Sequence, residues 1–239
     1  MVAANRDEFF SRPTAGPAWL ESPRSVWLGV DLRAGGTWLG ANEYGVVAGV
    51  LNRRAATPPD PSRRSRGVLV ADVLRCKSAE EAMGLVESFA PGAFNPCTLL
   101  VADLLQVVLL ANEPDRWRCR ELGPGLHVVT NRETESLECP RHERTVRLLS
   151  PVVPALEAGE LERALTMIRQ ALSDHGDNST AANDPLSVPC VHTPEYGTRS
   201  SALLILEPLA GRIRLFHAPD APCRARWEEL PSLFLASER

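Results

Sequence analysis

The stretch GGTWLGANEYGVVAGVLN, residues 35–52, indicates antiparallel β-structure. It opens on the turn signal Gly35-Gly36, and a second turn signal at residues 42–45 separates two short apolar runs. Short apolar runs between Gly and Asn turns are typical of a β-meander. The runs are almost without polar interruption, which favours strands buried on both faces of a sheet.

The segments on either side are expected to be strands and helices in irregular order. Residues 53–66 form a Pro- and Arg-rich loop, which is either a solvated linker or an anion-contacting loop. Ser78 and Glu81 have the spacing of a capping box, which predicts a helix over Ala79–Ala90. Apolar periodicity predicts another helix over Glu160–His175. Further helices are expected at 67–76 and 143–149, strands at 2–4, 26–32, 97–104, 107–111, 126–130, 200–206 and 212–217, a polar loop at 177–198, and a short tail around Trp227.

This order lacks the regular βαβ alternation that a doubly wound parallel sheet requires. Antiparallel sheets covered by helices fit it better, so we expect the α+β class. The sequence shows no internal repeat and no linker, which predicts a single domain over residues 1–239.

Composition narrows the classes of partner. Of 239 residues, 44% are hydrophobic and 23% charged, as in a globular protein. The formal net charge of −4 argues against a dedicated binder of nucleic acid or of anionic membranes. No apolar run reaches the ~18–20 residues of a membrane helix. The N-terminus turns charged at once, so we expect no signal peptide and a cytoplasmic protein.

The cysteines and histidines show no metal-binding pattern. Six cysteines lie roughly 20 to 50 residues apart without a C-x-x-C, and we expect reduced thiols. The histidines have no metal-ligand spacing, and His127 is expected in the core of a strand. We therefore expect no metal site and no resident cofactor. Asn178-Ser179-Thr180 fits a glycosylation pattern that would be idle without secretion.

Polar residues stand at the ends of apolar strands, where a small pocket would be lined by them. Asn suits the orientation of a carbonyl or donation to an oxyanion, and Arg can hold a carboxylate with two hydrogen bonds. The alternative is that Asn at a strand end caps a turn. The segments are Asn5-Arg6-Asp7-Glu8, Asn52-Arg53, Asn131-Arg132 and Thr198-Arg199-Ser200-Ser201.

Several of these segments resemble the motifs of the NRDE family, also called the transport and Golgi organisation family. The first is AANRDEFFSRP at residues 3–13, and the second is GGTWLG at residues 35–40. Further matches are the strand ending in Asn52, Ser65-Arg66-Gly67, Val129-Thr130-Asn131 and Tyr196-Gly197-Thr198-Arg199. They follow in order over nearly the whole chain.

The resemblance implies a fold and a site. The family is similar to N-terminal-nucleophile hydrolases, so it implies two stacked antiparallel sheets sandwiched between α-helix layers. In the cysteine amidases of that fold, a processed N-terminal cysteine attacks an amide and its own α-amine acts as the base. By motif position, the resemblance implies that Asp7 is the Asp that holds the amine and that Asn52 and Asn131 are the two Asn of the oxyanion site. It implies that Arg199 is the Arg of the same cluster. Arg6 is a further candidate, although the amidases carry their Arg three residues before the Asp.

The sequence departs from the family at its start. Members begin Met-Cys and reach the motif after a further strand, whereas this chain reads Met1-Val2 directly before it. We expect either a true start upstream or a shortened, catalytically silent form, which would be unstable for want of a strand. Two functions stay open: a cysteine-type hydrolase of a linear non-peptide amide, and a non-catalytic carrier of haem or lipid. Both imply a small-molecule ligand, no nucleic acid and no membrane insertion.

Overall fold

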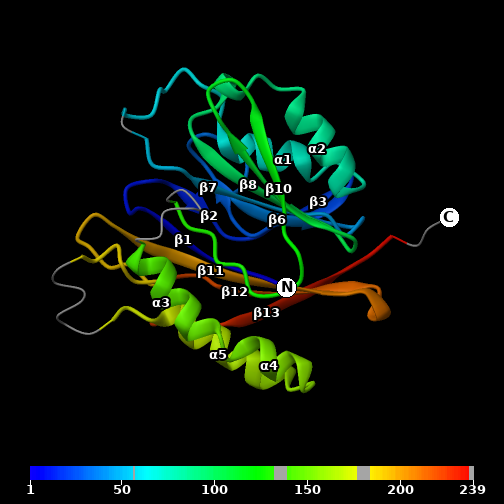
Figure 1. Ribbon diagram of the computed structural model, residues 1–239, viewed down its shortest axis with the longest axis vertical. Coiled ribbons are helices and arrows are strands. Elements are labelled where there is room, and N and C mark those ends of the chain that lie inside the picture. The colour runs from blue at the N-terminus through cyan, green and yellow to red at the C-terminus, as the bar shows by residue number, and fades with distance from the viewer. Residues whose placement is uncertain (56, 132–138, 177–183, 237–239) are drawn as a thin grey trace. The chain divides into compact units, whose positions relative to one another are not determined.

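A computed structural model describes residues 1–55, 57–131, 139–176 and 184–236 (Figure 1). Arg132 and Asn178-Ser179-Thr180, named above, lie outside the described residues. The strands are β1 (Val2–Phe9), β2 (Thr14–Ala15), β3 (Ala18–Glu21), β4 (Arg24–Trp27), β5 (Val30–Asp31), β6 (Leu39–Asn42), β7 (Val47–Asn52), β8 (Cys97–Ala102), β9 (Val107–Asn112), β10 (Trp117–Glu121), β11 (Tyr196–Glu207), β12 (Arg212–Ala218) and β13 (Glu228–Phe234). The α-helices are α1 (Arg66–Val73), α2 (Ala79–Glu87), α3 (Pro140–Leu149), α4 (Val152–Glu157) and α5 (Leu161–Ser173), with short 3-10 turns at Pro91–Ala93 and Pro208–Ala210.

The meander predicted from residues 35–52 is the centre of a seven-stranded sheet with strand order β10-β9-β8-β7-β6-β4-β3. Its neighbouring strands pair antiparallel, for example Val47 with Ala102 and Leu39 with Gly49. Helices α1 and α2 pack on strands of this sheet and close a core of Leu, Val and Phe side chains. The expected class of antiparallel sheet with covering helices is therefore observed.

Two glycine-containing motifs meet in this part of the chain. Gly36 has a φ of +79° and its neighbour Gly35 one of +72°, and a Cβ on Gly36 would lie 2.2 Å from the carbonyl oxygen of Gly67. The Thr37 N–H donates to that same oxygen at 3.1 Å. Only glycine permits this approach of two backbones. The motifs GGTWLG and Ser65-Arg66-Gly67 thus form one backbone contact at the start of α1.

Helix α2 begins with the predicted capping box. The Glu81 N–H donates to Ser78 Oγ at 3.1 Å, as expected. The Glu81 carboxylate accepts from the N–H of Lys77 at 2.7 Å. The reciprocal bond is therefore formed to the residue before the N-cap Ser78.

The second sheet has the order β1-β11-β12-β13. β1 runs antiparallel to β11, from Val2 opposite Leu204 to Phe9 opposite Tyr196, and Figure 1 shows the two side by side. The register shifts between Arg6 and Asp7, so β11 carries one extra residue there. Helix α5 buries the predicted apolar stripe and contacts β1.

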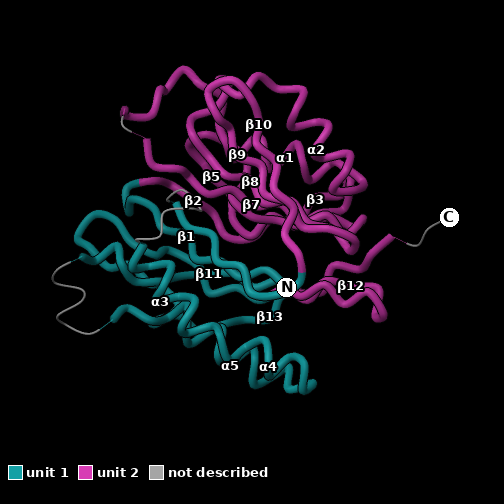
Figure 2. The backbone as a smooth tube through the Cα atoms, viewed as in Figure 1, with its two compact units in different colours: residues 1–11, 124–204, 216–230 teal, residues 12–123, 205–215, 231–239 magenta. Residues whose placement is uncertain are grey.

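The chain divides into two compact units (Figure 2). Unit 1 comprises Met1–Ser11, Pro124–Leu204 and Phe216–Leu230, and unit 2 comprises Arg12–Gly123, Ile205–Leu215 and Pro231–Arg239. The single domain over residues 1–239 stays a prediction. Within the described residues, no helix is long and apolar enough to cross a membrane.

Several expected boundaries were wrong. Residues 126–130 form no strand, so His127 does not lie in one; a β-branched run needs a strand neighbour to become β-structure. β1 continues through its polar residues to Phe9 because β11 supplies hydrogen-bond partners along that length. β11 begins at Tyr196 rather than at residue 200, so its first residues lie inside the expected loop. The strand expected at 26–32 is divided into β4 and β5 around Gly29, whose φ is +137°. α4 and β13 were not foreseen.

Candidate active site

Asp7 is anchored by two side chains from distant parts of the chain. Its Oδ1 accepts a hydrogen bond from the Thr198 hydroxyl at 2.6 Å, and its Oδ2 lies 2.7 Å from Nη2 of Arg141. The side chains of Asp7 and Arg141 are 10% and 21% exposed. Asp7 is thus a fixed, mostly buried carboxylate held by one neighbouring strand and one helix, β11 and α3.

Asn5, two residues before Asp7, is held in the same way. Its Nδ2 donates to the carbonyl oxygens of Leu172 and Pro189, each at 2.9 Å, and the Ser201 hydroxyl donates to its Oδ1. Arg141 also donates to the Pro189 carbonyl, at 2.9 Å. Residues two apart on a strand share a face, so both side chains point to the helices α3 and α5.

The segment 189–192 is fastened to this network through Thr198. The Val191 N–H donates to Thr198 Oγ1 at 2.8 Å, and the Thr198 N–H donates to the Val191 carbonyl at 2.9 Å. The Cys190 N–H donates to the Asp174 carbonyl at 3.0 Å, just after α5. Asn5 and Asp7 therefore fix the position of the segment that carries Cys190 and His192.

The other predicted site residues lie as follows. Arg6, directly before Asp7 in β1, is buried. Arg199 donates to the Phe9 carbonyl at 3.2 Å. Asn131 is half-buried and lies outside the helices and strands. Asn52 is the last residue of β7, in unit 2. Their convergence on one pocket stays a prediction.

A cluster of two thiols and one imidazole was not foreseen from the sequence. Cys190 Sγ lies 3.7 Å from Cys223 Sγ and 3.5 Å from His192 Nε2, and His192 Nε2 lies 3.2 Å from Cys223 Sγ. Cys190 and His192 are two residues apart, but Cys223 follows 31 residues later in the connection between β12 and β13. The one local signal was therefore the pair Cys190-x-His192.

Burial shifts the pKa of Cys190 and of His192. Burial and the adjacent Cys223 thiol raise the pKa of Cys190. Burial lowers the pKa of His192, with the Arg224 charge acting in the same direction. Cys190 is therefore a thiol and His192 a neutral imidazole near neutral pH. Elsewhere burial raises the pKa of Cys97 to about 12 and of Cys76 to about 11, so these thiols are poor nucleophiles.

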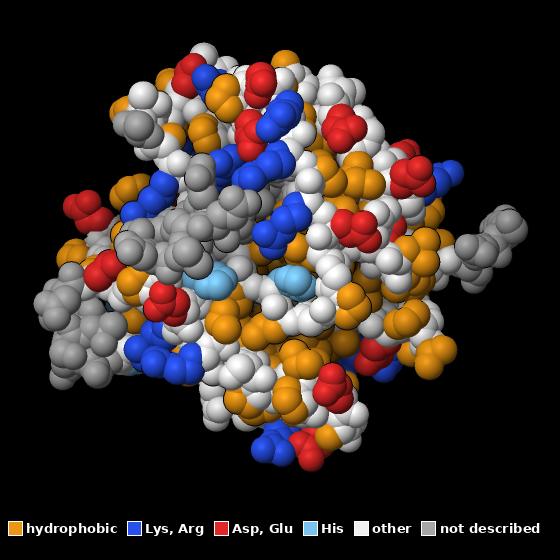
Figure 3. All heavy atoms as spheres, viewed as in Figure 1, with side chains coloured by type: hydrophobic (Ala, Val, Ile, Leu, Met, Phe, Trp, Pro, Cys, Tyr) orange, Lys and Arg blue, Asp and Glu red, His pale blue; other side chains and the backbone are white. Residues whose placement is uncertain are grey.

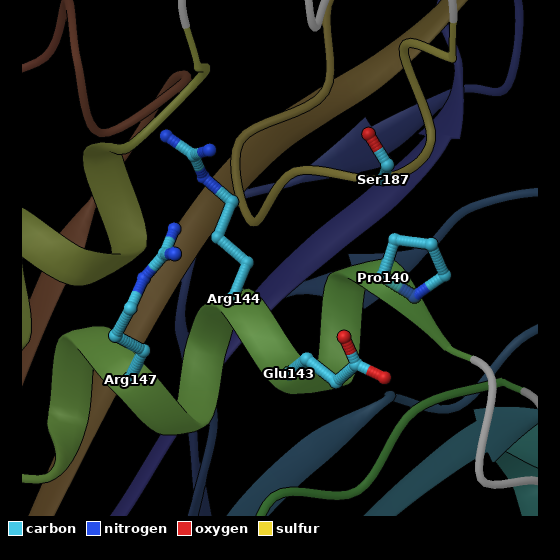
Figure 4. A pocket seen from close by; sticks show the side chains of 5 residues that line it. All are labelled: Pro140, Glu143, Arg144, Arg147 and Ser187. Atoms are coloured by element: carbon cyan, nitrogen blue, oxygen red, sulfur yellow. The ribbon is translucent and has the colours of Figure 1, made fainter.

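A hollow of about 380 Å³ lies along α3 (Figure 4). Arg144 and Arg147 extend from the helix in Figure 4, and Ser187 faces them from a loop. Arg144 donates to both carboxylate oxygens of Asp174, and these hydrogen bonds lower the pKa of Asp174. Arg144 is therefore committed to Asp174.

The surface carries both signs of charge. On the face drawn in Figure 3, acidic and basic side chains both occur among apolar ones. This agrees with a formal net charge of only −4.

Comparison with known sequences gives one family. The family description "Transport and Golgi organisation 2" matches residues 1–216. A Transport and Golgi organization 2 homolog from Mus musculus is 36% identical over 229 residues, which cover 87% of this chain and 82% of the relative.

Comparison with solved structures gives the fold. An N-acylethanolamine-hydrolyzing acid amidase ortholog from Caenorhabditis elegans has a TM-score of 0.55 at 12% identity, over 96% of this chain and 98% of that one. A variant of conjugated bile acid hydrolase from Clostridium perfringens has a TM-score of 0.54 at 10% identity, over 99% and 94%. The expected α+β fold of N-terminal-nucleophile hydrolase type is thereby confirmed.

Proposed function

The chain belongs to the Transport and Golgi organisation 2 family, and from its fold and the fixed Asp7 carboxylate we propose that its site serves the hydrolysis of a linear, non-peptide amide. The observation that carries the proposal is Asp7, mostly buried and held by Thr198 and Arg141 near the end of β1. Both solved structures of similar fold are named for hydrolysis, one of N-acylethanolamines and one of conjugated bile acids.

The proposed reaction is acyl transfer to a thiol followed by hydrolysis. A cysteine thiolate adds to the amide carbonyl, the C–N bond breaks, and the amine leaves with the proton taken from the thiol. Water then hydrolyses the thioester and releases the acid. Asp7 would accept a hydrogen bond from the α-amine of that cysteine, and Asn52 and Asn131 would donate to the oxyanion. Arg199 and Arg6 would orient the substrate.

This reaction needs a thiol on a residue with a free α-amine. The six cysteines of the 239 residues are all internal, and Cys76 and Cys97 are held as thiols by burial. The experiment therefore supplies the nucleophile. Two proteins are compared: the 239-residue chain, and a form extended upstream to begin Met-Cys before the strand that carries Asp7.

Both proteins are incubated with an N-acylethanolamine and a conjugated bile acid, and the released amine is measured by mass spectrometry. We expect turnover by the extended form and none by the shorter one. Asp7→Asn should reduce the turnover by at least ~100-fold, within the usual contribution of a positioned acid–base group. Asp72→Asn serves as the control and should retain turnover. It removes a carboxylate of α1 that pairs with Arg64. A folded extended form without turnover of either substrate would refute the proposal.

The same experiment also tests a second candidate function, the binding of haem or lipid as a cargo. If the shorter chain binds haem with a shifted absorption spectrum or binds a fatty acid, and the extended form hydrolyses neither amide, the ligand is a cargo. Asn131→Ala should then leave the binding unchanged, because a carrier needs no oxyanion donor.

A further inference from the structure

We propose that Cys190, His192 and Cys223 bind a divalent metal ion such as Zn²⁺ through two sulfurs and one nitrogen. Among the residues that the structure describes, these three form a group whose ligand atoms all lie within 4.8 Å of one another, close enough to hold one metal ion. All three belong to unit 1. The proposal is independent of the proposed amide hydrolysis.

The spacing of the three ligand atoms fits a tetrahedral ion. Zn²⁺ binds Cys sulfur at about 2.3 Å and His nitrogen at about 2.0–2.1 Å, so tetrahedral angles put two sulfurs about 3.8 Å apart and a sulfur and a nitrogen about 3.5 Å apart. The observed separations are 3.7 Å for the two sulfurs and 3.5 and 3.2 Å for sulfur to nitrogen. The three ligand atoms therefore already have separations close to those that a tetrahedral ion requires.

The geometry differs from that of a disulfide. A disulfide requires about 2.05 Å between its sulfurs, whereas these lie 3.7 Å apart and all six cysteines are free thiols. The His192 nitrogen lies within 3.5 Å of both sulfurs, which a disulfide would not require. Binding an ion releases the two thiol protons to solvent, so the site becomes two thiolates and a neutral imidazole around one cation.

The ligands are held by backbone bonds to the polar network around β1. Pro189 accepts from Asn5 and Arg141, and Val191 is bonded in both directions to Thr198, which itself donates to Asp7. On the other side, the N–H groups of residues 224 and 225 both donate to the Ala221 carbonyl and form the turn that carries Cys223. Such supporting shells position ligands and raise metal affinity.

The fourth position is on the open side of the cluster. Cys190 is buried, but His192 and Cys223 are half-buried. The exposed ring of His175 lies edge-to-face with that of His192 at 5.7 Å between centroids. A water molecule or a small ligand can thus complete the tetrahedron, which is the arrangement of catalytic rather than structural zinc sites.

The test is metal stoichiometry on the reduced, full-length chain. The chain is stripped with a chelator, given one equivalent of Zn²⁺ or Co²⁺, desalted and analysed by mass spectrometry for metal content. We expect close to one ion per chain, and thiolate-to-cobalt charge-transfer absorption with the cobalt form. Cys223→Ser and His192→Asn should each reduce retention at least ~10-fold, because losing a direct ligand costs no less than losing an outer-shell partner.

Cys119→Ser is the matched control, because Cys119 is an exposed cysteine near Met83 and outside the cluster. It should bind metal like the parent chain. Circular dichroism establishes that each variant is folded. The proposal is overturned if the reduced parent chain retains no metal, if the variants retain as much as Cys119→Ser does, or if the cobalt form lacks thiolate charge transfer.

Discussion

The ion pair between Asp7 and Arg141 gives the sharpest quantitative prediction. The two charges approach to 2.7 Å and are mostly shielded from water. Two unit charges about 4 Å apart interact by about 4 kcal/mol at an effective dielectric constant of 20, before desolvation is subtracted. Because both side chains keep some exposure, we expect a coupling energy of about 1–2 kcal/mol.

Asp7→Asn keeps an oxygen for the Thr198 hydroxyl but removes the charge that faces Arg141. It should destabilise the protein by about 2 kcal/mol, because a partly buried guanidinium loses its counter-charge. For a chain of 239 residues this corresponds to a fall in melting temperature of about 4–8 °C.

The assay is a double-mutant cycle of Asp7→Asn and Arg141→Met, with free energies of unfolding taken from urea titrations. The second substitution should cost little once the first is present. The exposed pair of Glu160 and Arg163 at the start of α5 gives the control cycle, with an expected coupling below about 0.5 kcal/mol. A coupling between Asp7 and Arg141 as small as that of the control pair would refute the reasoning, because the ion pair would then not stabilise the fold.

Three further predictions concern buried polar groups and a helix cap. Asn42→Ala should cost about 3–5 kcal/mol in urea denaturation, because the fully buried amide donates to the carbonyls of Leu74 and Cys76 and accepts two backbone N–H groups; a loss below about 1 kcal/mol would contradict this. Burial lowers the pKa of His217, so its contribution to stability is present above about pH 6.5 and is lost as pH falls through the lowered pKa; His217→Leu should flatten this part of the melting-temperature profile, and an unchanged slope would count against it. Ser78→Ala should lower the free energy of unfolding by about 1 kcal/mol, seen as a shift of the urea midpoint without a change of slope.

Local signals in the sequence were enough to predict helices α2 and α5. The capping box at Ser78 and the apolar spacing within α5 depend on residues three or four positions apart, and the structure has both helices within a few residues of the expected ends. The meander of residues 35–52 was predictable for the same reason, since its strands pair with sequence neighbours.

Long-range pairings set the limit of prediction. Asn5 and Asp7 suggested a strand end, but they lie within a strand because their partners Ser201 and Thr198 stand more than 190 residues later. The thiol–imidazole cluster was missed because Cys223 is 31 residues from His192, beyond any spacing motif. The roles assigned to Asn52, Asn131 and Arg199 by resemblance stay predictions.

The pairing of β1 with β11 has a consequence for the order in which the chain folds during synthesis. The strands of the seven-stranded sheet all lie between residues 18 and 121 and can pair as they emerge from the ribosome. β1 is made before these strands, yet Thr198, the partner of Asp7, is made 191 residues later. At about 5–20 residues per second, that delay is about 10–40 s. β1 therefore stays without its neighbouring strand while the whole seven-stranded sheet is made, and we expect it to depend on chaperones over that interval.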